Sequence, residues 1–198
     1  MPHWKSLIFV IVMTAALLLA ACAGTETEPG TDADSQPEES ADAAERPDLL
    51  GSFTATDLNG DPADQSIFDG YELTMVNVWA TFCGPCLQEM PDLGELAEEY
   101  SDQGVQIVGL VADVLESDGT ISQEQVDLAR EIVTETGANY LHLLPSEDLY
   151  GILAQCQFVP TTFFVDSEGK QVGRAYVQAM SKSQWKEVIQ SVLAEMES

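Results

Sequence analysis

The sequence predicts an α/β fold in which helices cover both faces of a central sheet. Residues 73–80 and 105–112 are two apolar runs of strand length, which is typical of strands covered on both faces. Helical patterns follow them at 84–101 and 122–136. Strands that alternate with helices in this way, and end in a hairpin and a closing helix, favour a sheet between two layers of helices.

Local signals place the other elements. Pro91 predicts a kink in the first helix, Ser122 begins the second helix as its N-cap, and Gly137 stops it. Ser146 and Ser181 are N-cap candidates for two later helices. In chain order, the remaining predicted elements are a strand at 53–56, a turn at 59–61, a strand at 141–144, a short helix at 146–154, a strand at 161–165, a hairpin turn at 167–170, a strand at 171–178 and a helix at 181–196.

The composition is strongly acidic. The 198 residues include 34 acidic and 7 basic ones, for a formal charge of −27, and 25 of the acidic residues lie in 49–198. A protein that binds nucleic acid through its phosphates needs clustered Lys and Arg, and so does a patch that docks on anionic lipid. The charge therefore argues against both classes. With 45% hydrophobic residues, the chain can still build a core for one domain.

The first 22 residues are predicted to be a signal peptide rather than part of the fold. Residues 7–21 are apolar throughout, which is short for a membrane-spanning helix of about 20 residues but suits a signal-peptide core. Residues 19–22 (LAAC) resemble the bacterial lipobox, so we expect lipidation at Cys22 and attachment to the lipid bilayer of the cell membrane. The alternatives are an ordinary cleaved signal and an uncleaved anchor. All three place the rest of the chain outside the cytoplasm.

An acidic tether is predicted at 23–48. This segment contains no aromatic residue and no Ile, Leu, Val or Met, and its single basic residue is Arg46. Such a segment cannot bury enough apolar surface to offset the entropy of ordering, and its charges repel one another. We therefore expect a disordered, extended tether, followed by one folded domain at 49–198.

The chemistry is predicted at Cys83-Gly84-Pro85-Cys86, between a buried strand and a helix. Unpaired N–H groups and the macrodipole at a helix N-terminus stabilise a thiolate at Cys83, which can attack a disulfide in a partner. Cys86, one turn later, can attack the mixed disulfide and release the partner. Gly84 allows a substrate backbone to approach closely, and Pro85 fits the first helical turn, where no N–H partner is lost.

Two other interpretations of the cysteine pair are a metal site and an inert disulfide. A structural zinc site needs two more ligands, and Cys156, His142 and His3 do not have the spacing of a ligand pair. A disulfide that spans four residues at a helix start restrains little of the chain. We therefore predict redox activity, without a metal at the site.

Three motifs carry a family resemblance: VNVWATFCGPCLQEMP at 76–91, VQIVGLVADV at 105–114 and VPTTFFVDSEGKQVG at 159–173. Through them, residues 49–198 resemble the extracytoplasmic TlpA/ResA-like branch of the thioredoxin superfamily. The resemblance implies a thioredoxin-like fold, with a central mixed sheet flanked by helices and an insertion after the CxxC-bearing βα unit, within 115–140. It also implies a thiol-disulfide oxidoreductase whose redox-active disulfide replaces any other cofactor.

The resemblance also implies which residues bind the substrate. Val159 and Pro160 match the family's cis-proline loop, which lies beside the cysteines and presents backbone to the substrate. Phe82 stands where the family usually has Trp, so it keeps an apolar platform but lacks the indole N–H. Together with Gly84 and Pro85, these residues form the predicted substrate-binding set.

Two polar residues, Asn77 and Glu89, differ in whether they can accept the proton of the resolving cysteine. Asn77 replaces the buried Asp of cytoplasmic thioredoxins, and an amide cannot shuttle the resolving proton. Glu89 matches a glutamate that the TlpA/ResA-like branch keeps near its active site, and it lies one helical turn from Cys86. Our hypothesis is that Glu89 helps manage the Cys86 proton, and the alternative is a solvated helix glutamate.

Four further residues receive a structural interpretation. Cys156 is predicted to be a buried thiol, with a third redox thiol as the alternative. His142 and Trp185 are predicted to be packing residues. Asp113, which follows a strand, is predicted to be a cap or loop contact rather than a catalytic residue.

The predicted activity is reduction of protein disulfides. The Gly-Pro between the cysteines resembles reducing thioredoxins, and because the outside of a cell is generally oxidising, a reductase there must be recharged. The resemblance implies a membrane electron donor of the CcdA/DsbD type. The clients considered are apocytochrome c, oxidatively damaged surface proteins and another thiol enzyme.

Three alternative functions stay open at this point. The chain can instead be an oxidant that forms disulfides, a peroxiredoxin-like peroxidase or a copper-binding chaperone on the same fold. Ala80 disfavours the peroxidase, because a peroxidatic cysteine follows a Thr or Ser by three positions. Copper chaperones of this fold generally space their cysteines more widely and add a His.

Overall fold

A mixed sheet of five strands forms the centre of the computed structural model, which describes residues 46–197. Its strand order is β5-β4-β3-β6-β7, in which β3 is parallel to β4 and antiparallel to β6. The pair β4–β5 is parallel and the pair β6–β7 is antiparallel. The strands are β3 (Leu73–Trp79), β4 (Val105–Val111), β5 (Leu141–Leu143), β6 (Thr161–Asp166) and β7 (Gln171–Tyr176).

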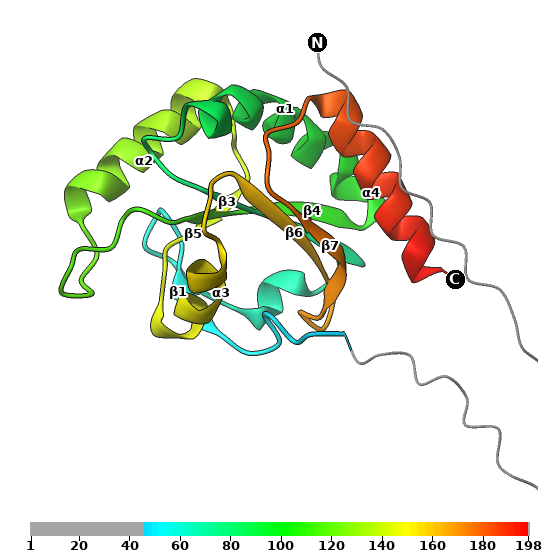
Figure 1. Cartoon of the computed structure of the whole chain (residues 1–198), viewed down its shortest axis with the longest axis horizontal. Helices are drawn as coiled ribbons and strands as arrows, with labels where there is room; N and C mark the ends of the chain where they lie inside the picture. The colour runs from blue at the N-terminus through cyan, green and yellow to red at the C-terminus, as the bar shows by residue number, and fades with distance from the viewer. Residues whose placement is uncertain (1–45, 198) are drawn as a thin grey trace, which may run out of the picture. The chain divides into compact units, whose positions relative to one another are not determined.

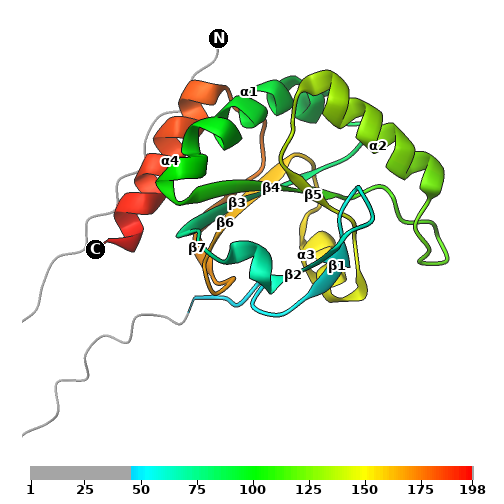
Figure 2. The ribbon, with the colours of Figure 1, turned by 180° about the vertical axis from the view of Figure 1, so that it is seen from behind.

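Helices cover both faces of this sheet (Figures 1 and 2). On one face, α1 (Gly84–Tyr100) contacts both α2 (Gln123–Thr136) and α4 (Lys182–Met196), and α3 (Tyr150–Gln155) lies on the other. Because β4 and β5 are parallel, the chain must cross over between them, and α2 makes this crossover within 115–140. None of the helices in the described part of the chain is long and apolar enough to span a bilayer.

The strand β3 is buried along its whole length and divides the core in two. Met75 and Trp79 pack towards α1, α2 and α4, whereas Val76 and Val78 pack with Ile152 of α3 on the opposite face. This division follows from the alternation of side chains along a strand. Burial on both faces explains why the segment is almost continuously apolar in sequence.

A small hairpin covers the β5 edge of the sheet. It consists of β1 (Thr54–Thr56) and β2 (Pro62–Asp64), and the 3-10 helix η1 (Gln65–Phe68) follows it. Neither β2 nor η1 was predicted from the sequence. The N–H of Leu58 donates to the carbonyl of His142 (2.9 Å), and the N–H of Leu144 donates to that of Thr56 (2.8 Å). These bonds satisfy backbone groups that an open edge would leave unpaired.

The described chain begins beside the β6–β7 hairpin (Figure 1). Gln171 N–H donates to the carbonyl of Pro47 (2.8 Å), and Arg46 forms a salt bridge with Asp166 (2.6 Å). Residues 46–48, which the sequence places at the end of the tether, therefore contact the β6–β7 hairpin through their backbone and through the charge of Arg46. The predictions for 1–45, which include the signal peptide and Cys22, lie outside the described residues.

The helix ends agree with the sequence signals in most places. Gly137 ends α2 with a φ of 70°, a left-handed conformation that glycine adopts without strain. The N–H of Ser181 donates to Gln184 Oε1 at the start of α4 (3.0 Å). The single helix predicted at 146–154 is instead the 3-10 helix η3 (Glu147–Leu149) followed by α3, and the short 3-10 helix η2 (Ser101–Gln103) extends α1.

Candidate active site

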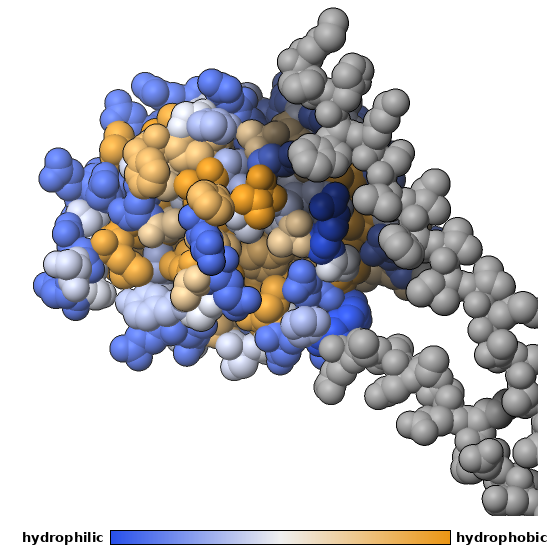
Figure 3. All heavy atoms as spheres, in the orientation of Figure 1, coloured by the Kyte–Doolittle hydropathy of each residue, from blue (hydrophilic) through white to orange (hydrophobic). Residues whose placement is uncertain are grey.

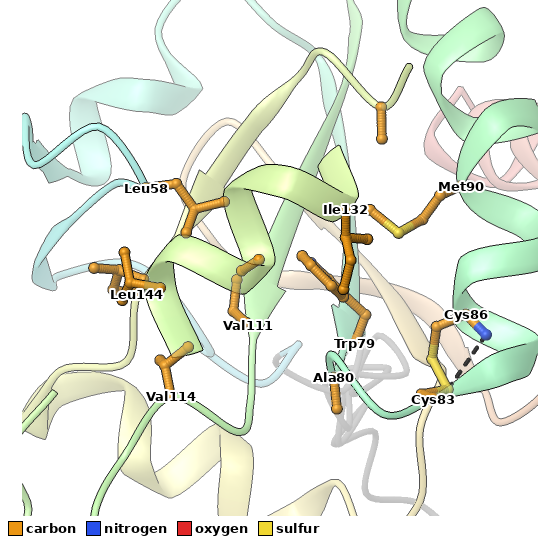
Figure 4. Packing of buried hydrophobic residues seen from close by; sticks show 13 residues of the cluster. Leu58, Trp79, Ala80, Cys83, Cys86, Met90, Val111, Val114, Ile132 and Leu144 are labelled. Carbon is orange, nitrogen blue, oxygen red and sulfur yellow. Dashed lines mark hydrogen bonds between the residues drawn. A yellow bond between two sulfur atoms is a disulfide. The ribbon is translucent and has the colours of Figure 1, made fainter. Parts of the chain in front are cut away.

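Cys83 and Cys86 form a disulfide at the N-terminus of α1. Cys83 is the N-cap residue, and its Sγ accepts a hydrogen bond from the backbone N–H of Cys86 at 3.2 Å (Figure 4). Cys86 is fully buried, whereas Cys83 is 5% exposed. Cys83 is therefore the less deeply buried of the two cysteines.

Three strands bring further segments to the same end of the sheet. Thr161 at the start of β6 lies opposite Val78, which places the preceding Val159–Pro160 bond at the end where the cysteines follow β3. This bond is cis, as the resemblance implies. Because β7 is antiparallel to β6 and ends beside its start, the segment between β7 and α4 reaches the same place.

We call the surface formed by residues 82–88, 155–160 and 177–181 the redox face. It exposes three large apolar side chains: Phe82 (77% exposed), Phe158 (69%) and Val177 (57%). None of the residues in these three segments is charged, in a chain with a formal charge of −27. Apolar side chains gather at the centre of the face seen in Figure 3, with hydrophilic ones around them.

The predicted substrate-binding residues all lie on the redox face. Phe82, Gly84 and Pro85 are exposed around the disulfide, Val159 is half-buried, and Pro160 is buried. Phe158 and Val177 were missed by sequence reasoning. The one signal for Phe158 is its position next to Val159–Pro160, and Val177 has no sequence signal because only the sheet topology brings it here.

Glu89 lies one turn after the disulfide and is buried, with 3% of its surface exposed. Its Oε1 accepts a hydrogen bond from Asn77 Nδ2 (3.0 Å), and its Oε2 accepts one from Met180 N–H (3.0 Å) and one from Trp185 Nε1–H (3.2 Å). Burial raises the pKa of Glu89 above its ordinary value, these three bonds oppose that rise, and the charge of Asp92 adds to it. Glu89 is thus not a solvated helix residue, and its part in catalysis stays a prediction.

Asn77 links Glu89 to the strand that follows the cis-proline. It is fully buried, and its Nδ2 also donates to Thr162 Oγ1 at 3.0 Å. Its Oδ1 has no hydrogen-bond partner among the described residues. One buried polar network therefore joins α1, β3, β6 and α4 behind the disulfide.

Asp113 holds the loop that carries the redox pair. Both of its carboxylate oxygens accept a hydrogen bond from Thr81 N–H at 3.0 Å, and Oδ2 also accepts one from Thr81 Oγ1 at 2.6 Å. Thr81 precedes Cys83 by two residues, so these bonds tie the end of β4 to the start of the redox loop. The prediction that Asp113 is a loop contact is confirmed.

Comparison with known proteins identifies the family of this chain. Residues 48–172 match the family described as the AhpC/TSA family. The thiol-disulfide oxidoreductase ResA of Bacillus thuringiensis subsp. konkukian is 31% identical over 143 residues, which cover 71% of this chain and 72% of the relative. The chain belongs to the AhpC/TSA family. It is a thiol-disulfide oxidoreductase, similar to ResA.

Other relatives of this thiol-disulfide oxidoreductase agree. The thiol:disulfide interchange protein DsbE of Vibrio cholerae is 31% identical over 134 residues, which cover 67% of this chain and 64% of the relative. A solved thiol:disulfide interchange protein of the thioredoxin family from Chlorobium tepidum covers 75% of this chain and 97% of its own, with a TM-score of 0.61 at 23% identity. The predicted thioredoxin-like fold is confirmed.

His142 of the oxidoreductase packs in the core and also makes hydrogen bonds. Its Nδ1 accepts a bond from Trp79 Nε1–H (3.1 Å), and its Nε2–H donates to the carbonyl of Ala138 (2.9 Å). Burial lowers the pKa of His142 to about 4, so the imidazole is neutral at neutral pH. A Cβ at position 109 would lie 2.1 Å from Nδ1, which explains why Gly109 stands there.

Cys156 is a free, half-buried thiol. It lines a cavity of about 250 Å³ together with apolar residues that include Ile152 and Phe163. Burial raises the pKa of the Cys156 thiol, so little of it is thiolate at neutral pH. This supports the interpretation of Cys156 as a structural thiol. Within residues 46–197, no group of three or more His, Cys, Asp or Glu side chains is arranged to hold a metal ion.

Proposed function

We propose that the chain reduces protein disulfides outside the cytoplasm through the Cys83/Cys86 dithiol, and that a lipid on Cys22 holds it at the membrane. The observation that carries this proposal is the asymmetry of the pair. Cys83 is the N-cap residue of α1 and is 5% exposed, whereas Cys86 is fully buried one turn behind it. The attacking thiol, Cys83, must contact the client disulfide, whereas the resolving thiol, Cys86, needs to react only with Cys83. The disulfide is the sole redox group in this proposal.

The reaction consists of two exchanges. The Cys83 thiolate attacks a client disulfide, so that one bond forms between Cys83 and the client while the client S–S bond breaks and its first thiolate leaves to take up a proton. Cys86 then loses its proton and attacks Cys83, which forms the intramolecular disulfide and releases the second client thiol. Two electrons pass to the client. We propose Glu89, one helical turn from Cys86, as the acceptor of the Cys86 proton.

The redox face favours one kind of client. It combines the exposed rings of Phe82 and Phe158 with the cis bond at Val159–Pro160, and this combination suits an extended peptide that carries apolar side chains next to its cysteine. The chain as a whole carries a formal charge of −27, which repels a strongly acidic partner. We therefore propose unfolded or locally extended segments of neutral or basic proteins as clients.

The direction and the electron donor are proposed from the sequence. The Gly84-Pro85 dipeptide resembles that of reducing thioredoxins, and a donor of the CcdA/DsbD type in the membrane would recharge the pair. Arg46 contacts Asp166, which pairs with Leu73 at the start of β3, whereas the redox pair follows the end of that strand. The chain therefore enters the domain away from the redox face, and this leaves that face open to a membrane donor and to clients.

Trapping of a mixed disulfide tests the proposed function. The Cys86→Ser variant keeps Cys83 as the attacking thiol and removes the resolving one, so it should accumulate client proteins bound to Cys83 that are released by dithiothreitol. The matched control is Cys83→Ser, which should trap none. Equal recovery with both variants, or none with a folded Cys86→Ser variant, would count against exchange with proteins.

Two further measurements test the finer parts of the proposal. The reduction potential of the pair, set against glutathione, should lie near that of thioredoxin, about −270 mV; a value well above it would make the protein an oxidant instead. Metabolic labelling with a palmitate analogue should mark the wild-type chain and leave Cys22→Ser unlabelled. Unchanged labelling of that variant would overturn the lipid anchor while leaving the redox proposal intact.

A further inference from the structure

Trp185 has a contact that a purely packing residue does not need. It is fully buried in α4, and its indole N–H donates to Glu89 Oε2 (3.2 Å) on α1. The same oxygen accepts the N–H of Met180, just before α4 begins (3.0 Å). One carboxylate oxygen of α1 therefore contacts both α4 and the segment that precedes it.

We propose that Trp185 is a positioning residue of the redox reaction: its indole N–H holds Glu89 as a carboxylate inside the core, oriented to accept the proton of Cys86. This inference rests on the proposed dithiol function. It goes beyond the part proposed for Glu89, because it assigns to a residue of another helix the control over when Glu89 can act as a base.

The hydrogen bonds around Glu89 suit its charged form. A carboxylate only accepts hydrogen bonds, and all three groups that contact Glu89 are donors: Asn77 Nδ2, Met180 N–H and Trp185 Nε1. Protonation of Glu89 would replace one of its acceptor sites with an O–H donor and so weaken this match. Burial favours the neutral acid and raises the pKa of Glu89, and the three hydrogen bonds oppose that rise because they favour the carboxylate.

The titratable groups near Glu89 do not replace these donors. On α1, Asp92 raises the pKa of Glu89 through its charge. Before β5, Tyr140 is a neutral phenol whose pKa is raised by burial and by the charge of Glu89. Cys86 is the third titratable group, one turn away on α1. The facing groups of β3, β6 and α4 are Asn77, Thr162 and Trp185, and none of them titrates.

The chain offers a matched control for Trp185. Trp79 is equally buried and also donates its indole N–H to a buried acceptor, but that acceptor is His142 rather than Glu89. Trp185→Phe and Trp79→Phe therefore each remove one indole N–H donor and a similar side-chain volume, from two different clusters of the core. Only the first is expected to change the protonation of Glu89.

The test follows the reaction of the reduced, full-length protein with 5,5′-dithiobis(2-nitrobenzoate) by stopped flow across pH. The first phase reports the attack by Cys83, and the second reports the attack by Cys86 that releases the second thionitrobenzoate. In the wild type the rate of the second phase should rise with pH through the titration of Glu89, and this inflection should be absent in Glu89→Gln. In Trp185→Phe it should move upward by about one pH unit, because one hydrogen bond to the charged form is lost.

Three results separate the possible failures. If the wild type releases only one thionitrobenzoate, the dithiol function itself fails. If both phases occur but the inflection of Trp185→Phe equals that of the wild type, or moves equally in Trp79→Phe, the assignment of Trp185 is wrong and the dithiol function stands. If Trp185→Phe does not fold, benzothienylalanine in the Trp79→Phe background supplies the indole shape without the N–H, and the same upward shift is expected from it.

Discussion

Phe82 and Phe158 expose their rings on the redox face, and replacing either with Ala should weaken the turnover of protein disulfides. The rings are 77% and 69% exposed. A fully covered aromatic side chain buries about 150–250 Å², so a client that covers the exposed part removes roughly 100–190 Å² per ring from water. At about 25 cal/mol per Å², this corresponds to an upper limit of roughly 2.5–5 kcal/mol per ring.

The measured effect should be smaller than this limit. Docking also orders the client segment and the side chains that contact it, and only the surplus appears as affinity. We expect each single substitution to lower kcat/KM for insulin reduction by about 5- to 30-fold, which corresponds to about 1–2 kcal/mol. Phe158→Ala is the more informative variant, because Phe158 is not adjacent to a cysteine in sequence.

A small substrate separates docking from cysteine chemistry. The disulfide 5,5′-dithiobis(2-nitrobenzoate) is too small to cover both rings, so its rate should change by less than about twofold in the same variants. Met196→Ala is the matched control, because Met196 is also an exposed apolar residue (37%) but lies at the far end of α4. Equal losses on insulin and on the small disulfide, or an unchanged rate on insulin, would refute the docking role of the rings.

Three further predictions follow from the structure. The pKa of His142 lies at about 4 in the folded protein against 6.5 as an ordinary value, so below pH 6.5 the unfolded state takes up a proton that the folded state refuses; acidification from pH 7 to 4 should cost about 3 kcal/mol of stability at this site, and urea unfolding should show a smaller acid loss for His142→Gln. Asp113→Ala should lower the free energy of unfolding by about 1–3 kcal/mol with an unchanged m-value, because Thr81 loses a charged acceptor, and an unchanged midpoint in urea would contradict this. In the oxidised protein at pH 8, iodoacetamide should react with Cys156 several-fold more slowly than it reacts with free glutathione, because burial raises the pKa of Cys156. The rate is measured by mass spectrometry of the Cys156 adduct over time, and a rate equal to that of glutathione would contradict the prediction.

The fold and the redox pair were predictable from the sequence because both depend on short-range patterns. The apolar run of β3, the turn that follows it and the helix that begins at Gly84 are consecutive in the chain, so the position of Cys83 at a helix N-terminus needs no tertiary information. The same holds for Asp113. It follows β4, which is parallel to β3, so the two strands end at the same edge of the sheet. These predictions are confirmed.

The partners of Glu89 and the extent of the redox face were not predictable in this way. Trp185 was predicted to be a packing residue, since nothing near position 185 indicates that its N–H meets a carboxylate 96 residues earlier. Phe158 and Val177 lie in segments that only the pairing of β6 and β7 brings to the disulfide. Burial of Glu89 is likewise a consequence of α4 packing on α1, which the helix sequence alone does not specify.

The sequence by itself determined the α/β class, the position of the cysteine pair and the acidic character of the chain, because hydrophobic periodicity and residue type act locally. Only the tertiary structure decided which cysteine is the less buried, which donors surround Glu89 and which apolar side chains are exposed on the redox face. These depend on contacts between segments far apart in the chain, and their energies come from burial and hydrogen bonding that exist only once the sheet and its two helical layers have packed.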